Sequence, residues 1–328
     1  MNRPCISVVV PCFNEQEVLP ATAESLAHEL DSLARNGLIA ADSRIVFIDD
    51  GSIDRTWDII TGLVDSDRRF AAVRLTRNFG HQYALYAGLM LSPGDALISI
   101  DADLQDDIAA IREMIVMFGG GKDIVYGVRS DRATDTAFKR ITAGLHYRLT
   151  RWLGVETVPN HADFRLMSRH AISLLAQYRE SNLYLRGIVP LLGLPTGTVN
   201  FKRHARLQGK SKYSLAKMLS LSLRGLTSFS IMPLRLIAVM GMMVFAVSMI
   251  MGAWALLAAL GNPSVVPGWA STVIPVYILG GLQLLALGIV GEYIGKSYME
   301  VKHRPLFLVQ ETRALVTTRP ALEATHLD

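Results

Sequence analysis

A run of acidic residues offers the clearest chemistry in this sequence. The stretch ISIDADLQDD, residues 98–107, places Asp101, Asp103 and Gln105 at alternate positions after an apolar segment. Alternate side chains of an extended backbone point to the same side, so these three can share one face. Carboxylate and amide oxygens are the ligands that hard divalent cations prefer, and Mg²⁺ commonly shares its coordination shell with substrate phosphates. By itself the pattern is weak evidence for a metal site and favours a solvated acidic turn, so its interpretation depends on the rest of the chain.

The last two acids of the stretch have a different expected role. Asp106 and Asp107 directly precede the helical pattern of Ile108–Phe118. A carboxylate at a helix start accepts hydrogen bonds from exposed backbone N–H groups and complements the helix dipole. We therefore expect ligands in the first half of the run and helix-capping residues in the second.

Short β-rich runs alternate with helical patterns over the first two thirds of the chain. The predicted strands are Ile6–Val10, Ile45–Asp49, Phe70–Leu75, Ala96–Asp101 and Asp123–Tyr126, with predicted helices at Glu17–Asn36 and Arg55–Val64. This alternation predicts an α/β fold of βαβ units around a mostly parallel sheet, with ligands bound at the carboxyl ends of the strands.

Polar clusters follow four of these strands. PCFNE follows the first strand, DDGS the second, RNFGHQ the third and DADLQDD the fourth. Because the carboxyl ends of parallel strands meet at one edge, four polar strand ends indicate a binding site more than four separate surface turns. In DDGS and PCFNE the side chains either accept hydrogen bonds from a nucleobase or ribose hydroxyl or stabilise turns. No G-x-G-x-x-G follows the first strand, so a dinucleotide fold of that kind is not indicated.

Two long apolar runs lie in the last third of the chain. Half of the 328 residues are hydrophobic and the mean hydropathy is +0.29. Leu236–Leu260 and Ala270–Val290 are each long enough to cross a hydrocarbon core of about 30 Å as a helix that rises about 1.5 Å per residue. The loop between them has no Lys or Arg, whereas Arg235 precedes the first run and Lys296 follows the second. By the positive-inside rule, this pattern predicts a transmembrane hairpin with both flanks in the cytoplasm.

The charge distribution narrows the class of partner. The net charge is only +4, but basic residues gather at 202–217 and 296–304. No long basic run alternates with aromatic residues, so an anionic membrane surface or a phosphate-bearing ligand is indicated and a nucleic acid is not. Cys5 and Cys12 lack a metal-type spacing and are expected to be reduced and packed. The polar tail after Pro305 is predicted to be disordered.

Seven motifs occur in order along the chain: VVVPCFNE, DDGS, RNFG, DADLQD, DFRLMSR, RLQGKSKYS and GEYIGKSYMEVKHRPLF. In this combination the sequence resembles the family 2 glycosyltransferases that act on polyprenyl phosphate. It is most similar to the bacterial bactoprenol glucosyltransferases, with the dolichol-phosphate mannose synthases as more distant relatives. The resemblance covers about Ile6–Leu308.

The resemblance implies a nucleotide-sugar-binding domain of the GT-A type, which is a Rossmann-like α/β fold, followed by the two-helix transmembrane hairpin. The expected organisation is a cytoplasmic catalytic domain at 1–212, an amphipathic juxtamembrane segment at 213–235, transmembrane helices at 236–260 and 270–294, an external loop at 261–269 and a cytoplasmic tail at 295–328.

The same resemblance assigns site residues by their positions in the motifs. The expected nucleotide-sugar pocket is formed by Pro11, Asn14, Glu15, Asp49, Asp50, Ser52 and Asp101. The expected ligands of Mg²⁺ or Mn²⁺ are Asp101, Asp103 and Gln105. The expected contacts to the acceptor phosphate are Arg129 and Arg140, and Arg206 and Lys212 belong to a basic segment expected to close over the donor or acceptor phosphates.

Asp103 and Asp163 are the expected catalytic residues, and the role of Asp163 has alternatives. It occupies the place of a catalytic or acceptor-orienting carboxylate, or it organises Arg165. A phosphate monoester has a second pKa of about 6, so the acceptor is largely anionic at neutral pH and needs little help from a general base. His81 follows RNFG at a position where Lys is expected about as often as His, and His81 is therefore assigned no catalytic role.

The implied reaction is metal-dependent, inverting transfer of a single sugar from a nucleotide sugar, UDP-glucose first, to polyprenyl (undecaprenyl) phosphate. GlcNAc, galactose, mannose from GDP-mannose and a modified pentose remain alternative sugars. A processive synthase would carry Q-x-x-R-W, whereas LTRW at 149–152 lacks the Gln. A non-catalytic, membrane-anchored sugar-nucleotide binding protein is the other alternative. The expected location is the bacterial inner membrane, as a multi-pass protein with a cytoplasmic catalytic domain, and homo-oligomerisation is left open.

Overall fold

A computed structural model of the chain describes residues 3–129, 161–178, 180, 183–201, 237, 239–244, 246–247, 250 and 269–315. The chain divides into two compact units. The first contains residues 1–149, 156–213 and 305–328, and the second contains residues 150–155 and 214–304. The second unit is therefore inserted in the sequence between segments of the first.

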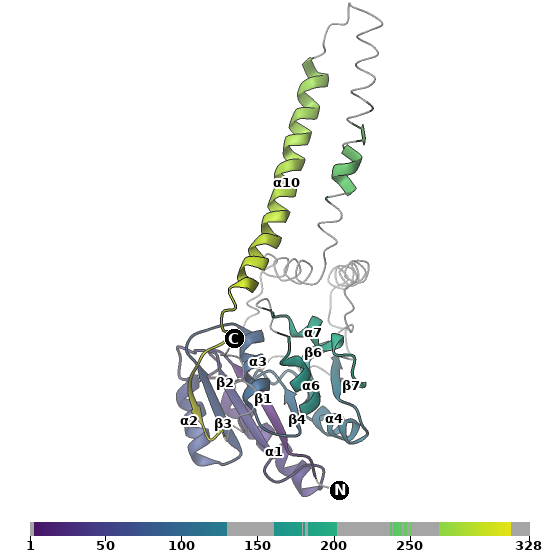
Figure 1. Cartoon of the computed structure of the whole chain (residues 1–328). Helices are drawn as coiled ribbons and strands as arrows, with labels where there is room; N and C mark the ends of the chain where they lie inside the picture. Colours follow the sequence, from purple (N-terminus) through teal and green to yellow (C-terminus); the bar gives the residue numbers. More distant parts are fainter. Residues whose placement is uncertain are drawn as a thin grey trace, which may run out of the picture. The chain divides into compact units, whose positions relative to one another are not determined.

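The described part of the first unit is built on an eight-stranded sheet (Figure 1). Its strands are β1 (Ile6–Cys12), β2 (Arg44–Asp49), β3 (Phe70–Leu75), β4 (Ala96–Ser99), β5 (Ile124–Arg129), β6 (His161–Ser168), β7 (Thr196–Phe201) and β8 (Val309–Arg313). Their order across the sheet is β7-β5-β6-β4-β1-β2-β3-β8. The five predicted strands are confirmed, and β1 is apolar throughout because a central parallel strand is covered on both faces.

Helices cover both faces of this sheet (Figure 1). They are α1 (Leu19–Arg35), α2 (Thr56–Ser66), α3 (His81–Leu91), α4 (Ala110–Gly119), α6 (Arg169–Leu175) and α7 (Leu185–Leu191). The first two, with α4, share one buried cluster with Val8 and Val10 of β1. The opposite face receives α3, where a Cβ on Gly88 would lie 2.3 Å from a Val9 methyl group and 2.8 Å from Ile48. Glycine at position 88 therefore allows α3 to approach the sheet closely.

Strand direction explains why residues far apart in the sequence reach one edge. The neighbouring strands β4, β1, β2 and β3 are parallel, so their carboxyl ends lie together. β6 runs antiparallel to β4, with Ser99 opposite Arg165. Asp163, near the start of β6, therefore lies at the edge where β4 ends. This position was not evident from the alternation of strands and helices.

The segment after Pro305 is ordered, and the prediction of a disordered tail is wrong for its described part. β8 pairs antiparallel with β3, and the Thr76 N–H donates to the Leu308 carbonyl at 3.0 Å. The Phe307 ring contacts Tyr86 of α3 edge-on, with centroids 6.4 Å apart. Pairing with a neighbouring strand satisfies backbone groups whatever the side chains are, so a polar segment can still form an edge strand.

The second unit contains α10 (Trp269–Val301), a helix of 33 residues. Several of its large apolar side chains are exposed, among them Val276, Leu287 and Ile294. It coincides with the predicted second span but continues beyond it and carries Glu292, Lys296 and other polar residues. The predicted first span is described only at scattered helical positions between residues 237 and 250.

No helix in the part of the chain that the structure describes is long and apolar enough to cross a membrane. This finding contradicts the predicted location as a multi-pass inner-membrane protein. The transmembrane hairpin is likewise not confirmed, because α10, the long helix of the described residues, is not found to meet this requirement. The predicted domain boundaries remain predictions.

Candidate active site

The loops after β1 and β2 are joined by hydrogen bonds. The Asn14 N–H donates to the Ser52 hydroxyl at 3.0 Å, and the Ile53 N–H donates to the Asn14 side-chain oxygen at 3.0 Å. The Glu15 N–H donates to the Thr56 hydroxyl at 2.9 Å. Asn14 has a positive φ of 55°, a conformation that asparagine tolerates better than most residues. The structure thus brings together the predicted residues of these two loops, and Pro11 lies in the strand that precedes them.

Asp49, the last residue of β2, is enclosed by the protein. Its side chain has no exposed area. One carboxylate oxygen accepts a hydrogen bond from the Ser52 N–H at 3.2 Å, and the other lies 3.4 Å from Nε of Arg74. Burial raises the pKa of Asp49, and the Ser52 hydrogen bonds and the Arg74 charge oppose the shift. Both oxygens of this predicted nucleotide-binding residue therefore contact neighbouring groups of the chain.

Asp50 fixes the loop that follows β3. It is 2% exposed, and its two oxygens accept hydrogen bonds from the backbone N–H groups of Phe79 at 2.7 Å and Gly80 at 2.9 Å. The neighbouring Gly51 has a φ of 69°, and a Cβ there would lie 2.5 Å from the backbone of Arg77. Only glycine fits this close contact between the two loops. Asp50 therefore determines where α3 begins.

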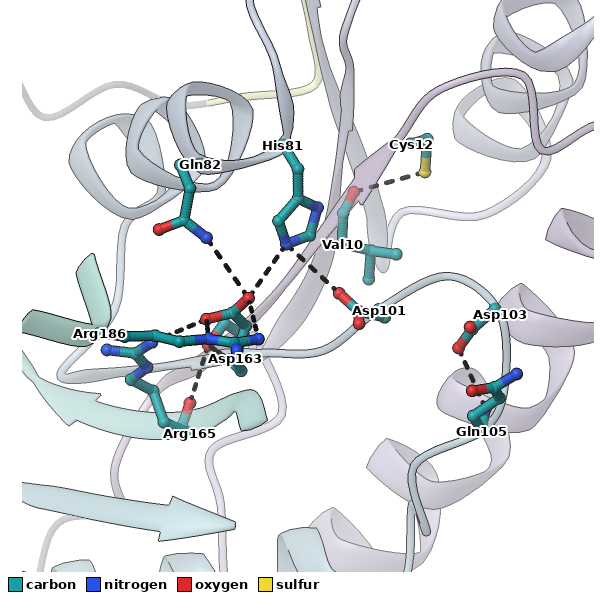
Figure 2. A network of polar contacts seen from close by, with 11 residues as sticks. Val10, Cys12, His81, Gln82, Asp101, Asp103, Gln105, Asp163, Arg165 and Arg186 are labelled. Carbon is teal, nitrogen blue, oxygen red and sulfur yellow. Dashed lines mark hydrogen bonds and ion pairs between the residues drawn. The ribbon is translucent and has the colours of Figure 1, made fainter. Parts of the chain in front are cut away.

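The D-x-D segment after β4 divides into two contacts (Figure 2). Oδ1 of Asp101 lies 3.5 Å from Nε2 of His81, and Oδ1 of Asp103 accepts a hydrogen bond from the Gln105 N–H at 3.2 Å. Leu104, which lies between Asp103 and Gln105, has a φ of 53°, which is unusual for a non-glycine residue. Backbone strain of this kind is concentrated at functional sites in proteins.

These oxygen donors fit a divalent cation that substrate helps to coordinate. Among the described residues, no group of three or more His, Cys, Asp or Glu side chains could hold a metal ion. The Asp101 side chain is 38% exposed, so it is open to a ligand. Mg²⁺ is commonly bound by one or two carboxylates together with phosphate oxygens and water, and two carboxylates at alternate positions meet that requirement.

Asp163 lies at the centre of a polar network (Figure 2). Arg186 of α7 contacts it in bidentate geometry, with Nε 3.0 Å from Oδ1 and a terminal nitrogen 2.9 Å from Oδ2. The guanidinium of Arg165, which is 1% exposed, donates at 3.1 Å. From the first turn of α3, Gln82 donates at 3.3 Å and Nε2 of His81 lies at 3.5 Å. Four side chains from three elements therefore surround one carboxylate.

The network shifts the protonation of its members. Burial alone would raise the pKa of Asp163, but the contact with His81 and the charges of Arg186 and Arg165 hold it well below its usual range. Burial would lower the pKa of His81, and the two carboxylates outweigh burial and raise it. Partial burial raises the pKa of Asp101, with His81 opposing the shift. Asp163 is therefore a carboxylate that is difficult to protonate.

Other predicted site residues are described less fully or not at all. Arg129 is the last residue of β5. Arg140, Arg206 and Lys212 lie outside the described residues. The Asp107 side chain accepts a hydrogen bond from the Ala109 N–H at 3.0 Å, just before α4, as expected for a residue at a helix start.

Sequence reasoning missed three residues that contact Asp163: His81, Gln82 and Arg186. The first two follow the third predicted strand, in the RNFGHQ cluster, so the strand-end pattern was a usable signal for them. Arg186 belongs to a short helix on a segment without a recognised motif, and only the folded chain brings it to this edge.

A comparison with families of known proteins agrees with the arrangement of the sheet and with the acidic residues at its strand ends. Residues 7–175 match the family described as glycosyl transferase family 2. The chain belongs to this family and is a glycosyltransferase, with an α/β sheet fold of the GT-A type. The predicted family and enzyme class are confirmed, and the alternative of a non-catalytic binding protein is set aside.

Individual relatives match nearly the whole chain. An uncharacterized glycosyltransferase of Bacillus subtilis (strain 168), YkoT, is 46% identical over 94% of this chain and 92% of its own length. A bactoprenol glucosyl transferase of Shigella phage SfV is 40% identical over 94% of this chain and 99% of its own. A prophage bactoprenol glucosyl transferase homolog of Escherichia coli (strain K12) is 39% identical, with the same two coverages.

Proposed function

We propose that this enzyme transfers a single glucose from UDP-glucose to polyprenyl phosphate, of which undecaprenyl phosphate is the first candidate, with inversion at the anomeric carbon and with the help of a divalent cation. The observation that carries the proposal is the arrangement at one sheet edge: the open carboxylate of Asp101 faces the Asp163–Arg186 pair across His81. The names of the relatives, bactoprenol glucosyl transferases, support this acceptor and this sugar.

The nucleotide is proposed to bind at the ends of β1 and β2. Asn14, Glu15 and Ser52 lie in the two joined loops there. The oxygens of Asp49 and Asp50 already accept hydrogen bonds from the chain or face Arg74. We therefore propose that these two acids shape the nucleotide pocket and do not hydrogen-bond to the nucleobase themselves.

The sugar diphosphate is proposed to lie beside Asp101, Asp103 and Gln105. When bound, Mg²⁺ or Mn²⁺ would supply positive charge that stabilises the negative charge growing on the departing diphosphate. The protein contributes the open carboxylate of Asp101 and, directly after Asp103, a residue of positive φ, Leu104, before Gln105.

Asp163 is proposed to orient the acceptor site rather than to act as a general base. Its oxygens already receive the donors of Arg165, Arg186 and Gln82. A carboxylate with a lowered pKa accepts a proton poorly, and a phosphate monoester is already largely ionised at neutral pH because its second pKa is about 6. We propose that Asp163 holds Arg186 in place, and that Arg186, whose side chain is 39% exposed, contacts the acceptor phosphate together with Arg129, Arg140, Arg206 and Lys212.

The transfer is proposed to be a direct displacement. An acceptor phosphate oxygen attacks the anomeric carbon from the face opposite the nucleotide, forming the new carbon–oxygen bond as the bond to the diphosphate breaks. No proton needs to leave the acceptor, which explains why the site can work with an aspartate that stays ionised. Arg186 and the site's other cations favour the bound phosphate over its hydrated state.

A radiolabel assay tests the proposal. Purified full-length protein is incubated with undecaprenyl phosphate, Mg²⁺ or Mn²⁺ and labelled UDP-glucose, and the chloroform-soluble label is counted. We expect label in the organic phase that disappears when EDTA is added or the lipid phosphate is left out. Label that persists in the presence of EDTA would contradict the metal requirement and would leave the proposed transfer reaction standing.

A panel of donors tests the sugar separately. UDP-GlcNAc, UDP-galactose, GDP-mannose and a UDP-pentose replace UDP-glucose under the same conditions. Faster transfer from one of these would change the donor and keep the acceptor. Absence of lipid-linked product with every donor would overturn the proposed acceptor.

A further inference from the structure

The His81 imidazole lies between two carboxylates from different strands. Its Nε2 is 3.5 Å from Oδ1 of Asp101 and 3.5 Å from Oδ2 of Asp163 (Figure 2). Asp101 follows β4, and Asp163 is in β6. The His81 side chain is 44% exposed, so it is not a core residue whose place is set by packing alone.

The fold sets the position of His81 from the other side of the site. It is the first residue of α3, and the two preceding residues donate their N–H groups to Asp50. Gly80 has a φ of 106°, which directs the chain into the helix. The burial of α3 against the sheet at Gly88 then holds the helix itself.

The next residue, Gln82, has a different role in the network, because its hydrogen bond is to Asp163. Its amide nitrogen donates to Asp163 at 3.3 Å, and its oxygen accepts a hydrogen bond from the Leu185 N–H at 3.1 Å. Gln82 thus connects Asp163 to α7, whereas His81 connects Asp163 to Asp101. The His81 imidazole therefore connects the Asp163 network to the exposed carboxylate of Asp101.

We propose that His81 is a positioning residue for sugar transfer, holding the Asp101 carboxylate in register with the Asp163–Arg186 pair. The inference deepens the proposed function and rests on it. Two carboxylates that face one another repel, and a donor between them removes that repulsion and fixes their separation. Without the imidazole, Asp101 turns away, and donor and acceptor are aligned less often.

Lysine is the informative replacement. An ammonium group on a flexible stem can donate to both carboxylates, whereas alanine can donate to neither. His81→Ala is expected to lower kcat by about 10- to 100-fold, since misplacement of reacting groups by about 1 Å can cost a factor of about 100. The KM for polyprenyl phosphate should change by less than about threefold, because Arg186 keeps its contacts with Asp163. His81→Lys should recover most of the lost kcat.

A second readout does not depend on the acceptor. Mn²⁺-dependent binding of UDP, and of GDP in parallel, is measured by calorimetry for the wild type, His81→Ala and His81→Lys. His81→Ala should weaken nucleotide binding in the presence of Mn²⁺ and leave binding without metal unchanged. His170→Ala is the matched control, because His170 is an exposed histidine of α6.

The outcomes separate the two proposals. If the wild type makes no lipid-linked sugar with any donor, the proposed function fails, and the Mn²⁺-dependent binding series still tests His81. If His81→Ala matches the wild type in kcat and in Mn²⁺-dependent binding, the positioning role is overturned. Loss of activity in His81→Ala that His81→Lys does not restore, with an unchanged unfolding midpoint, would also overturn it.

Discussion

The two acids at the end of β2 differ from the acids that follow β4 and lie near the start of β6. The Asp49 side chain has no exposed area, and both oxygens of Asp50 accept hydrogen bonds from the backbone. Asp101, by contrast, is 38% exposed, and Asp163 is held by arginines. Acids at one edge of the sheet therefore have different surroundings, since those of DDGS are enclosed by the chain and Asp101 is open. Asp49 and Asp50 hold the loops together, whereas Asp101 and Asp163 are the acids that we propose to lie beside the substrates.

Replacing Asp163 should have the largest effect. Asp163→Asn leaves Arg165, which is 1% exposed, without its carboxylate partner. Removing one member of a buried ion pair costs about 3 to 5 kcal/mol, so we expect a loss of about 3 kcal/mol in the free energy of unfolding together with loss of transfer. Denaturant unfolding and the radiolabel assay measure the two effects. A variant as stable as the wild type would show that the network contributes little to folding.

The same substitution predicts a pH dependence. The pKa of Asp163 is lowered in the folded state, below the ordinary aspartate value of about 3.9. The ionised carboxylate therefore stabilises the fold above about pH 4, and this contribution is lost as the pH falls through the lower folded-state pKa. The stability difference between wild type and Asp163→Asn should therefore shrink in acid, below about pH 4. Asp49 and Asp50, whose pKa values are raised, contribute with the opposite sign.

Asp103→Asn should remove activity without affecting the fold. Its Oδ1 accepts one local hydrogen bond from the Gln105 N–H, which an asparagine oxygen can also accept. Loss of a charged metal ligand is expected to lower transfer by at least about 100-fold, with an unfolding midpoint close to that of the wild type. Transfer at the wild-type rate would remove Asp103 from the metal site.

Asp50→Asn should show the reverse pattern. The asparagine amide nitrogen cannot accept one of the two hydrogen bonds from Phe79 and Gly80, which should cost about 1 to 3 kcal/mol of stability. Transfer should fall less than in Asp103→Asn, because Asp50 acts through the loop that carries His81. A stable Asp50→Asn protein with activity as low as that of Asp103→Asn would restore Asp50 to the nucleotide site as a direct ligand.

The smallest effect is expected at Asp107. Its carboxylate accepts a hydrogen bond from the Ala109 N–H in front of α4 and contributes to the start of that helix. Asp107→Asn keeps an acceptor oxygen and should cost less than about 1 kcal/mol, with transfer close to that of the wild type. Parallel unfolding and radiolabel measurements on this variant provide the baseline for the other three. A loss of transfer comparable to that of Asp103→Asn would place Asp107 in the site.

Much of the sheet could be predicted from the sequence because its central strands are local, apolar and followed by polar turns. The strand-end rule also located the D-x-D segment correctly at the edge of the sheet. β6 was harder, since the buried Arg165 breaks its apolar pattern, and β8 carries mostly polar residues. The roles of His81 and Arg186 depend on contacts between distant segments, which no local pattern records. The multi-pass location was predicted from hydropathy and was wrong, because no helix among the described residues meets the requirements of a membrane span.

Pairing of β8 with β3 has a consequence for the order in which the chain folds. The strand that covers this edge of the first unit comes from residues 309–313, after the whole of the second unit in the sequence. While the chain is being synthesised, β3 presents unpaired N–H and C=O groups, and such edges are templates for association with other chains. Completion of the catalytic sheet therefore waits until residues 309–313 have been synthesised, and a chain that stops before residue 309 would carry an open edge.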